Sequence, residues 1–167
     1  MPERKTIERA AQDRRRGKAP STQAGEFVRE EIEHVREGKH GVRSPKQAIA
    51  IGLSKARRAG VKLPPPKRGT TSEKTRTSAE HAYEAGKKGK KSVSGRRSRA
   101  ITGALKREPR STASKRAIGT QTRSAAKRRG ASARSAAARK AVRTKGAAGR
   151  SVAAKKAART RARKRRS

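Results

Sequence analysis

Large apolar side chains are scarce in this sequence, and more than half of them fall in one short stretch. Of the 19 Met, Ile, Leu, Val, Phe and Tyr residues in the 167-residue chain, ten lie between residues 21 and 63. The other nine are too scattered to form a second apolar core. Because high charge with low hydrophobicity is the signature of disorder, residues 21–63 are the only part predicted to build a folded module.

The spacing of apolar residues predicts two helices in this stretch, joined as a hairpin. The first covers about 22–38, begins at the hydroxyl of Ser21 or Thr22 and ends at Gly38. The second covers 45–59, where Ser44-Pro45-Lys46-Gln47 offers a capping hydroxyl, a proline at the first helical position and a glutamine that reaches back. Gly60-Val61 is typical of a Schellman end. The predicted core of the hairpin consists of Phe27, Val28, Ile32, Val35, Ile49 and Leu53.

The hairpin is too small to be stable by itself. A dimer, a third helix or a nucleic-acid surface is expected to complete it. The first helix carries five glutamates, whereas the second carries only basic charges. Antiparallel packing brings these opposite charges together, and the alternative is that the acidic face docks another basic surface such as the tail.

The predicted fold is mainly α, with this small hairpin and a long, largely disordered basic tail that contains short helical segments. Residues 1–20 are expected to form a basic helix or arm, and residues 64–108 a Pro/Lys-rich linker with short helices. Residues 109–167 form the tail, which holds 21 Lys and Arg and no acid. Its loose repeat of Arg, Ser, Ala and Lys, interrupted by Gly130, Gly146 and Gly149, predicts serine-capped helical units that form on a polyanion.

The formal net charge of +38 predicts phosphate binding, with DNA as the first expected partner and RNA as an alternative. Three arginines of the N-terminal arm and four cations of the second helix are expected to add secondary contacts: Arg14, Arg15, Arg16, Lys46, Lys55, Arg57 and Arg58. The predicted nucleic-acid-binding residues of the tail are Lys115, Arg116, Arg123, Lys127, Arg128, Arg129, Arg134, Arg139, Lys140, Arg143, Lys145, Arg150, Lys155, Lys156, Arg159, Arg161, Arg163, Lys164, Arg165 and Arg166.

Other functional classes lack their sequence signals. There is no cysteine, and His34, His40 and His81 show no ligand spacing, so no metal site is expected. No catalytic constellation is evident, so no enzyme, cofactor or small-molecule substrate is predicted. The chain has one Phe, one Tyr and no Trp, too few for a base-stacking platform. No secretory signal or membrane-spanning run is found, which favours a cytoplasmic, nucleoid-associated protein.

Two resemblances add to this interpretation. The segment VREEIEHVREGKHGVRSPKQAIAIGLSKARRAGVKLPPP, residues 28–66, resembles a family of small basic bacterial proteins of uncharacterised function, some of which are labelled DNA-binding or plasmid stabilisation proteins. The tail is similar in composition to histone H1-like bacterial tails and to linker-histone C-termini. The resemblances imply that the basic residues, taken as a class, contact phosphates. They assign no role to an individual residue.

Three hypotheses remain at this point. The first is a histone H1-like, nucleoid-associated protein that binds DNA without sequence specificity, with the hairpin as a protein-contact or homodimer module. The second is a plasmid-stabilisation or regulatory protein that reads a DNA site with helix 45–59. The third is an RNA-associated or ribosome-associated basic protein, or a surface-active cationic peptide.

Overall fold

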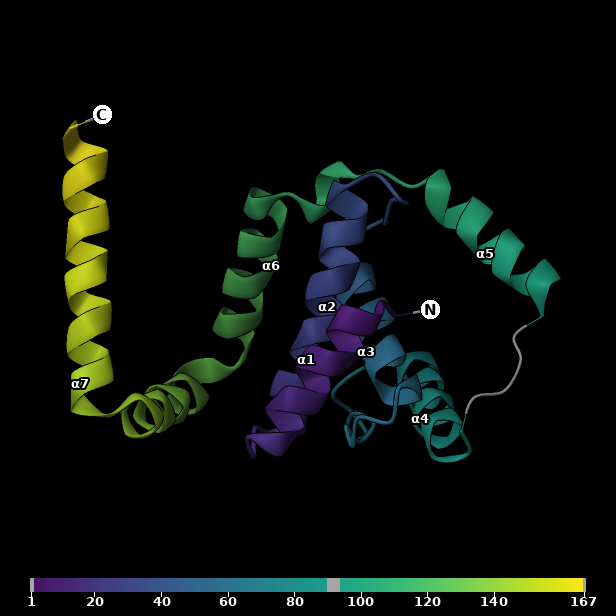
Figure 1. Cartoon of the computed structure of the whole chain (residues 1–167), viewed down its shortest axis with the longest axis horizontal. Coiled ribbons are helices and arrows are strands. Elements are labelled where there is room, and N and C mark those ends of the chain that lie inside the picture. Colours follow the sequence, from purple (N-terminus) through teal and green to yellow (C-terminus); the bar gives the residue numbers. More distant parts are fainter. Residues whose placement is uncertain (1, 90–93, 167) are drawn as a thin grey trace. The chain divides into compact units, whose positions relative to one another are not determined.

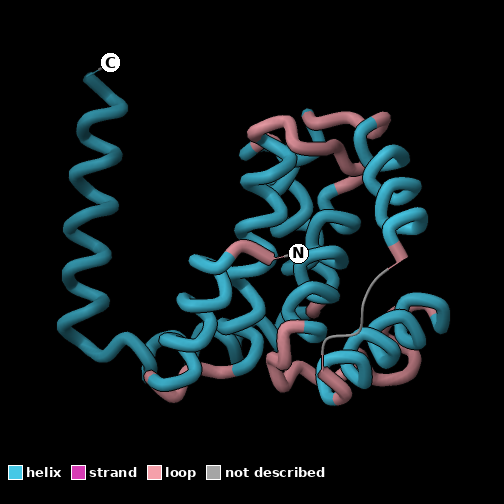
Figure 2. The backbone as a smooth tube through the Cα atoms, turned by 45° about the vertical axis from the view of Figure 1, so that its right-hand side comes forward, coloured by secondary structure: helices cyan, strands magenta, loops and turns pink. Residues whose placement is uncertain are grey.

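The computed structural model describes residues 2–89 and 94–166, and this part of the chain contains helices and loops without a strand (Figures 1 and 2). The prediction of a mainly α fold is therefore confirmed. In chain order the elements are α1 (Arg4–Arg15), α2 (Pro20–Arg36), α3 (Pro45–Arg58), α4 (Glu73–Lys87), α5 (Gly95–Lys106), the short 3-10 helix η1 (Ser111–Ala113), α6 (Lys115–Arg128) and α7 (Gly130–Arg166).

The chain divides into two units, one up to Gln121 and the other from Thr122 to the C-terminus. In the first unit α2 and α3 pack against each other, α1 packs on α2, and α4 packs on α3. The two-helix hairpin is thus present, and α1 and α4 pack on it to form a group of four packed helices within the first unit. A third helix was one of the three ways expected to complete the hairpin, and here two helices do so.

Two small apolar clusters hold the first unit together. Of the predicted core residues, Phe27 and Val35 are buried, Ile32 and Leu53 pack partly buried against the clusters, and Val28 and Ile49 are half-buried outside them. Alanine supplies much of the rest. The first cluster is Ala10, Ala24, Phe27, Ala56 and Val61, with Leu53 and Leu63 against it. The second is Val35, Val42, Ala48 and Ala113, with Ile32 and Ile51 against it.

Glycine and alanine let the helices approach closely enough for so few large side chains to fill the space between them. A Cβ atom built on Gly52 of α3 would lie 2.6 Å from Cα of Val28 in α2. One built on Gly86 of α4 would overlap the carbonyl oxygen of Arg57 in α3. The close backbone contact substitutes for the missing bulk, and large apolar residues alone were therefore a poor guide to the extent of the core.

The predicted ends of α3 are confirmed. Ser44 Oγ accepts a hydrogen bond from the Gln47 amide at 3.3 Å, and Pro45 is the first helical residue. Gly60 has a φ of 87°, and the Val61 amide donates to the Ala56 carbonyl, which is the Schellman arrangement. The predicted start of α2 is wrong. That helix begins at Pro20 after Ala19 without a side-chain cap, because proline at the first position already fixes φ and has no amide to satisfy.

Residues 105–113 lie across the loop between α2 and α3, where the sequence predicted the end of the linker and, from residue 109, the beginning of a disordered tail. The Gly41 amide donates to the Leu105 carbonyl at 2.9 Å, and the Val42 amide to the Pro109 carbonyl at 3.0 Å. Thr112 Oγ1 donates back to the Val42 carbonyl at 2.6 Å. Ala113 is fully buried in the second cluster. The boundary predicted at residue 109 therefore runs through a packed part of the first unit.

The prediction of a long disordered tail is wrong, since α6 and α7 form a helical C-terminal segment. Alanine, arginine and lysine are among the best helix formers, and their propensity outweighs the repulsion between cations on which the disorder prediction depended. Gly130 and Gly146 interrupt the helices as expected, with φ of 74° and 64°. The repeat serines are not caps: Ser124 lies inside α6, where it accepts a hydrogen bond from Arg128 at 2.7 Å.

Candidate nucleic-acid interface

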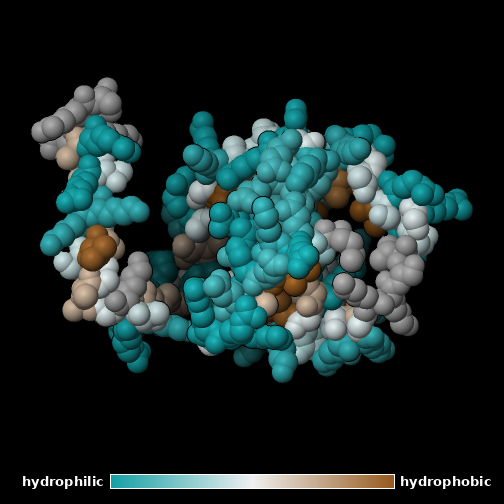
Figure 3. All heavy atoms as spheres, viewed as in Figure 1, coloured by the Kyte–Doolittle hydropathy of each residue, from teal (hydrophilic) through white to brown (hydrophobic). Residues whose placement is uncertain are grey.

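The second unit is a helical segment with positive charge and no negative charge. Residues 122–167 contain 18 Lys and Arg and no acidic residue. The described side chains of α7 are all exposed, including those of Val142 and Val152, so this helix buries no apolar face. On the face of α7 in view, Figure 3 shows hydrophilic side chains interspersed with pale and brown, more apolar ones. Nothing on α7 directs it to pack on an apolar core, and its surface is available to an anionic partner.

The cations surround α7 instead of lining one face. A helix turns by about 100° per residue, so Arg134, Arg139 and Lys140 point in three directions roughly 120° apart. Arg150 and the pair Lys155-Lys156 repeat the same spacing beyond the kink at Gly146. The two copies of the loose repeat thus place matching cations on both halves of the helix. Such a helix offers positive charge to phosphates on every side.

The predicted tail residues divide among the helices as follows. Lys115, Arg116, Arg123, Lys127 and Arg128 belong to α6, Arg129 lies between α6 and α7, and the others belong to α7. The side chains of Lys145, Lys164, Arg165 and Arg166 lie outside the described part of the structure. Among the predicted tail residues with a described side chain, every one is exposed.

Of the seven cations predicted to make secondary contacts with nucleic acid, two are bound by other groups of the protein itself. Lys55 Nζ lies 2.7 Å from Glu31 Oε2 and 3.4 Å from Glu30 Oε1. Arg57 is only 6% exposed and donates to the backbone carbonyls that follow α3; its burial lowers the pKa of the guanidinium. The remaining five are exposed: Arg14, Arg15, Arg16, Lys46 and Arg58.

The glutamates of α2 have partners within the first unit. Arg9 of α1 lies 3.0 Å from Glu26, Lys55 of α3 lies against Glu30 and Glu31, and Arg29 pairs with Glu33 along the helix. The predicted pairing of opposite charges between the two hairpin helices is thus observed at Lys55. Because the first unit uses acids to bind its own cations, unopposed charge is densest in the second unit.

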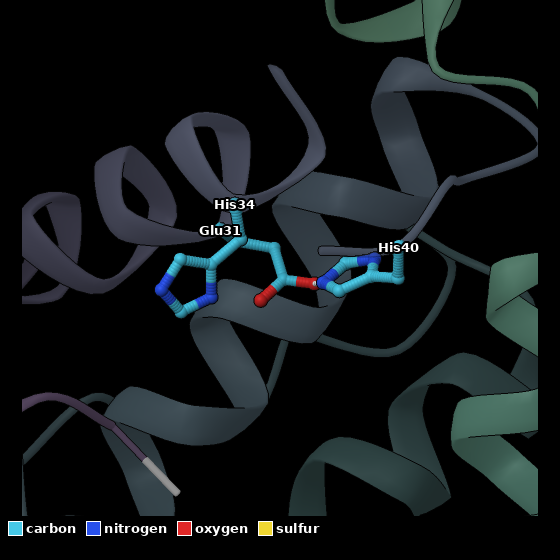
Figure 4. A group of neighbouring side chains, drawn as sticks. All are labelled: Glu31, His34 and His40. Atoms are coloured by element: carbon cyan, nitrogen blue, oxygen red, sulfur yellow. Dashed lines mark ion pairs between the residues drawn. The ribbon is translucent and has the colours of Figure 1, made fainter. Parts of the chain in front are cut away.

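One cluster of potential ligands was missed by the sequence analysis. Glu31, His34 and His40 place their ligand atoms within 4.8 Å of one another (Figure 4). Glu31 and His34 are three residues apart on α2, a spacing that puts them on one face and that the sequence could have revealed. His40 comes from the α2–α3 loop, after Gly38 with a φ of 81°. The earlier conclusion that the histidines lack ligand spacing is therefore wrong for two of the three.

Charged neighbours fix this cluster. His34 Nε2 lies 2.8 Å from Glu3 Oε1, and Lys39 Nζ lies 3.0 Å from the same oxygen. The hydrogen bond with His34, and then that with Lys39, lower the pKa of Glu3 to about 2. The Glu3 carboxylate is thus ionised at neutral pH and holds the His34 ring at the end of α2.

Comparison with known proteins finds a similarity for part of the first unit. Residues 3–68 match the sequence model of a family of unknown function, DUF6496. The matched region covers α1 to α3 and the proline-rich segment after them. A similarity to an uncharacterised family was expected for residues 28–66 and is confirmed, since the match includes them; it assigns no role to any residue.

No curated protein and no solved structure matches the chain. Among the helices that the structure describes, none combines the length and hydropathy that crossing a membrane requires.

Proposed function

We propose that this protein binds DNA without sequence specificity, with the cations of α6 and α7 neutralising backbone phosphates. The observation that carries the proposal is the absence of any acid among residues 109–167, which hold 21 Lys and Arg. Lys and Arg that contact phosphates release condensed counterions, which supplies most of the free energy of non-specific binding. A histone H1-like, nucleoid-associated role follows from this chemistry.

The arrangement of charge favours contact with the phosphate backbone over reading of bases. Phosphate contacts set position and orientation but carry little sequence information. Specific reading requires a defined set of side chains presented to base edges on one face of an element. The cations of α7 surround the helix, so they present no such face.

The alternative of a DNA site read by residues 45–59 receives no support from the packing. Helix α3 lies between α2 and α4, and its Lys55 and Arg57 are held by groups of the protein itself. The second unit therefore remains the better candidate for the interface. RNA is the other polyanion with the same backbone chemistry, and the test below separates it from DNA.

The test compares two variants of the full chain that lose the same charge in different places. In the first, Arg134, Arg139, Lys140, Arg150, Lys155 and Lys156 of α7 are changed to Gln. In the matched control, the six exposed cations Arg14, Arg15, Arg16, Lys46, Arg58 and Lys62 of the first unit are changed to Gln. Both variants have a net charge lower by six, so a difference between them reports position and not total charge.

Affinity for two unrelated DNA duplexes, duplex RNA and anionic vesicles is measured over a range of salt concentrations. We expect equal affinities for the two DNA duplexes. For the α7 variant the slope of log K against log salt should become shallower by about 5, at about 0.9 for each phosphate neutralised. The control should change much less. Equal losses in both variants would contradict the assignment to α7. A preferred duplex would favour the regulatory alternative, and a preference for RNA or vesicles would favour those partners.

A further inference from the structure

The cluster of Glu31, His34 and His40 is not used by the proposed DNA interface. It lies in the first unit, at the C-terminal end of α2 and in the loop that follows (Figure 4). Glu31 and His34 project from one face of α2, and His40 approaches the same carboxylate from the loop. The arrangement of their lone pairs and protons indicates what the cluster can bind.

The contacts of His40 determine which ring nitrogen faces the carboxylate as an acceptor. Nδ1 of His40 lies 3.0 Å from the carbonyl oxygen of Gly41. Because a carbonyl oxygen only accepts hydrogen bonds, Nδ1 is the protonated nitrogen. In the neutral ring Nε2 then carries a lone pair, yet it lies 3.2 Å from Oε1 of Glu31. Two lone pairs at this distance repel each other unless a cation or a further proton lies between them.

His34 has the same arrangement on the other side of the carboxylate. Its Nε2 lies 2.8 Å from a carboxylate oxygen of Glu3, and because such an oxygen accepts hydrogen bonds, this nitrogen carries the proton. Nδ1 is then the acceptor nitrogen, and Figure 4 shows a ring nitrogen of His34 facing the carboxylate of Glu31. Hydrogen bonds of this kind, from the far nitrogen of a histidine to a carboxylate or a backbone carbonyl, are typical of histidines that bind metals.

Glu31 itself is fully buried, at 0% exposure. Neither of its carboxylate oxygens makes a hydrogen bond of good geometry, although Lys55 Nζ lies 2.7 Å from Oε2 and His40 lies beside Oε1. Lys55 balances the charge on one oxygen only. His40 Nε2 lies 3.2 Å from the other oxygen, Oε1, and a buried carboxylate oxygen is costly without a cation to pair with it.

We propose that Glu31, His34 and His40 bind a divalent transition-metal ion, with Zn²⁺ as the first candidate. Two imidazole nitrogens and a carboxylate oxygen are a donor set that Zn²⁺ takes in proteins. Ligand atoms about 2.0–2.1 Å from a tetrahedral Zn²⁺ are about 3.3 Å apart. The 3.2 Å between His40 Nε2 and Glu31 Oε1 matches that separation.

The surroundings suit a cation and leave room for a fourth ligand. Although the whole chain is strongly basic, eight of its 12 acidic residues fall within the first 37 positions, so the local charge is much less positive. His40 also lines an open cavity of about 510 Å³ together with Gly41, Glu108, Pro109 and two cations, Lys106 and Arg110. Water from this side can take the fourth position. The ion would join α2 to the loop on which residues 105–113 dock.

The test uses the full chain without any added histidine tag. Zn²⁺ binding is followed by calorimetry, and Co²⁺ is added as a spectroscopic probe whose visible absorption reports tetrahedral nitrogen and oxygen ligation. We expect one ion per chain and a melting temperature that rises with Zn²⁺ and falls with chelator. His40→Gln and Glu31→Gln should each weaken binding by more than about 100-fold, since loss of an outer hydrogen-bond partner alone costs 10–100-fold.

The matched control is His81→Gln, which changes an exposed histidine of α4 outside the cluster. It should leave the affinity, the stoichiometry and the Co²⁺ spectrum unchanged. If His40→Gln lowers the helix content, His34→Gln provides a second variant that lacks one ligand. The Co²⁺ spectrum of the variant that folds then shows whether the removed histidine binds the ion. The proposal is overturned if neither ion binds. It is also overturned if His81→Gln weakens binding as much as His40→Gln.

Discussion

At the scale of single residues, the contact between α2 and α3 depends on Gly52. A Cβ at this position would lie 2.6 Å from Cα of Val28 and 2.9 Å from its backbone nitrogen. These are backbone atoms of a packed helix and cannot rotate away as a flexible side chain does. The two helices must therefore separate to accept even one methyl group, and the apolar clusters on both sides of the contact must loosen with them.

We predict that Gly52→Ala lowers the free energy of unfolding by about 2 kcal/mol, as overpacking of a tight interior typically does. The matched control is Gly25→Ala in α2, where nothing lies within 4 Å of the new Cβ. Alanine's better helix propensity should make that variant more stable by up to about 1 kcal/mol. Urea unfolding followed by circular dichroism measures both changes. Equal effects of the two substitutions would show that α2 and α3 do not approach at Gly52.

What the sequence could predict at this scale was local. Ser44, Pro45 and Gly60 define the ends of α3 through neighbouring residues, and all three act as predicted. Only part of the cluster around Glu31 could be predicted from the sequence. The spacing of Glu31 and His34 is helical, whereas His40 is placed by a loop. The position of a loop histidine depends on the packing of that loop, which no local pattern encodes.

At the scale of elements, the limits of the first unit were misjudged for the same reason. The irregular residues 107–110 after α5 have no periodic pattern, and η1 contributes only Ala113 to the core. Backbone hydrogen bonds carry this docking, and sequence patterns do not report them. Arg36 adds a side-chain contact, since its Nε donates to the Ala113 carbonyl at 2.8 Å. Residues 108–113 are therefore part of the packed structure of the first unit and contribute to its free energy of unfolding.

Truncation at two points tests this assignment. A chain cut after Arg107 loses the hydrogen bonds of Val42 to Pro109, of Thr112 to Val42 and of Arg36 to Ala113. At about 1 kcal/mol for each hydrogen bond, its free energy of unfolding should fall by about 3 kcal/mol. The matched chain cut after Gln121 keeps all three bonds and should unfold at the same urea concentration as the full chain. Coincident unfolding of the two truncated chains would refute the docking.

The C-terminal helices show a different limit of sequence reasoning. The composition of residues 109–167 contains two opposing signals, the strong helix propensity of Ala, Arg and Lys and the mutual repulsion of the cations. Giving the repulsion more weight led to the wrong prediction of a disordered tail. The glycine positions were interpreted more successfully: Gly130 and Gly146 have positive φ, whereas Gly149 lies inside α7 without interrupting it.

At the scale of the whole molecule, the charge is divided unevenly between the two units. Residues 1–121 carry 32 Lys and Arg against all 12 acidic residues, whereas residues 122–167 carry 18 Lys and Arg and no acid. Several cations of the first unit are held by its own carboxylates, as Arg9 is by Glu26 and Lys55 by Glu31. The second unit is shorter, wholly cationic and exposed, so it should supply most of the counterion release on DNA.

The chain cut after Gln121 separates this contribution from folding. If ten cations of the second unit engage phosphates, the slope of log K against log salt should be shallower than that of the full chain by about 9. Its affinity for DNA should then fall most at low salt, where counterion release is largest, while its unfolding midpoint stays that of the full chain. Filter binding or fluorescence anisotropy over a salt series measures the slope, and urea unfolding measures the stability. If the truncated chain kept the slope and affinity of the full chain, the first unit would have to be the DNA-binding surface, and its exposed Arg14, Arg15, Arg16, Lys46 and Arg58 would be the residues to test next.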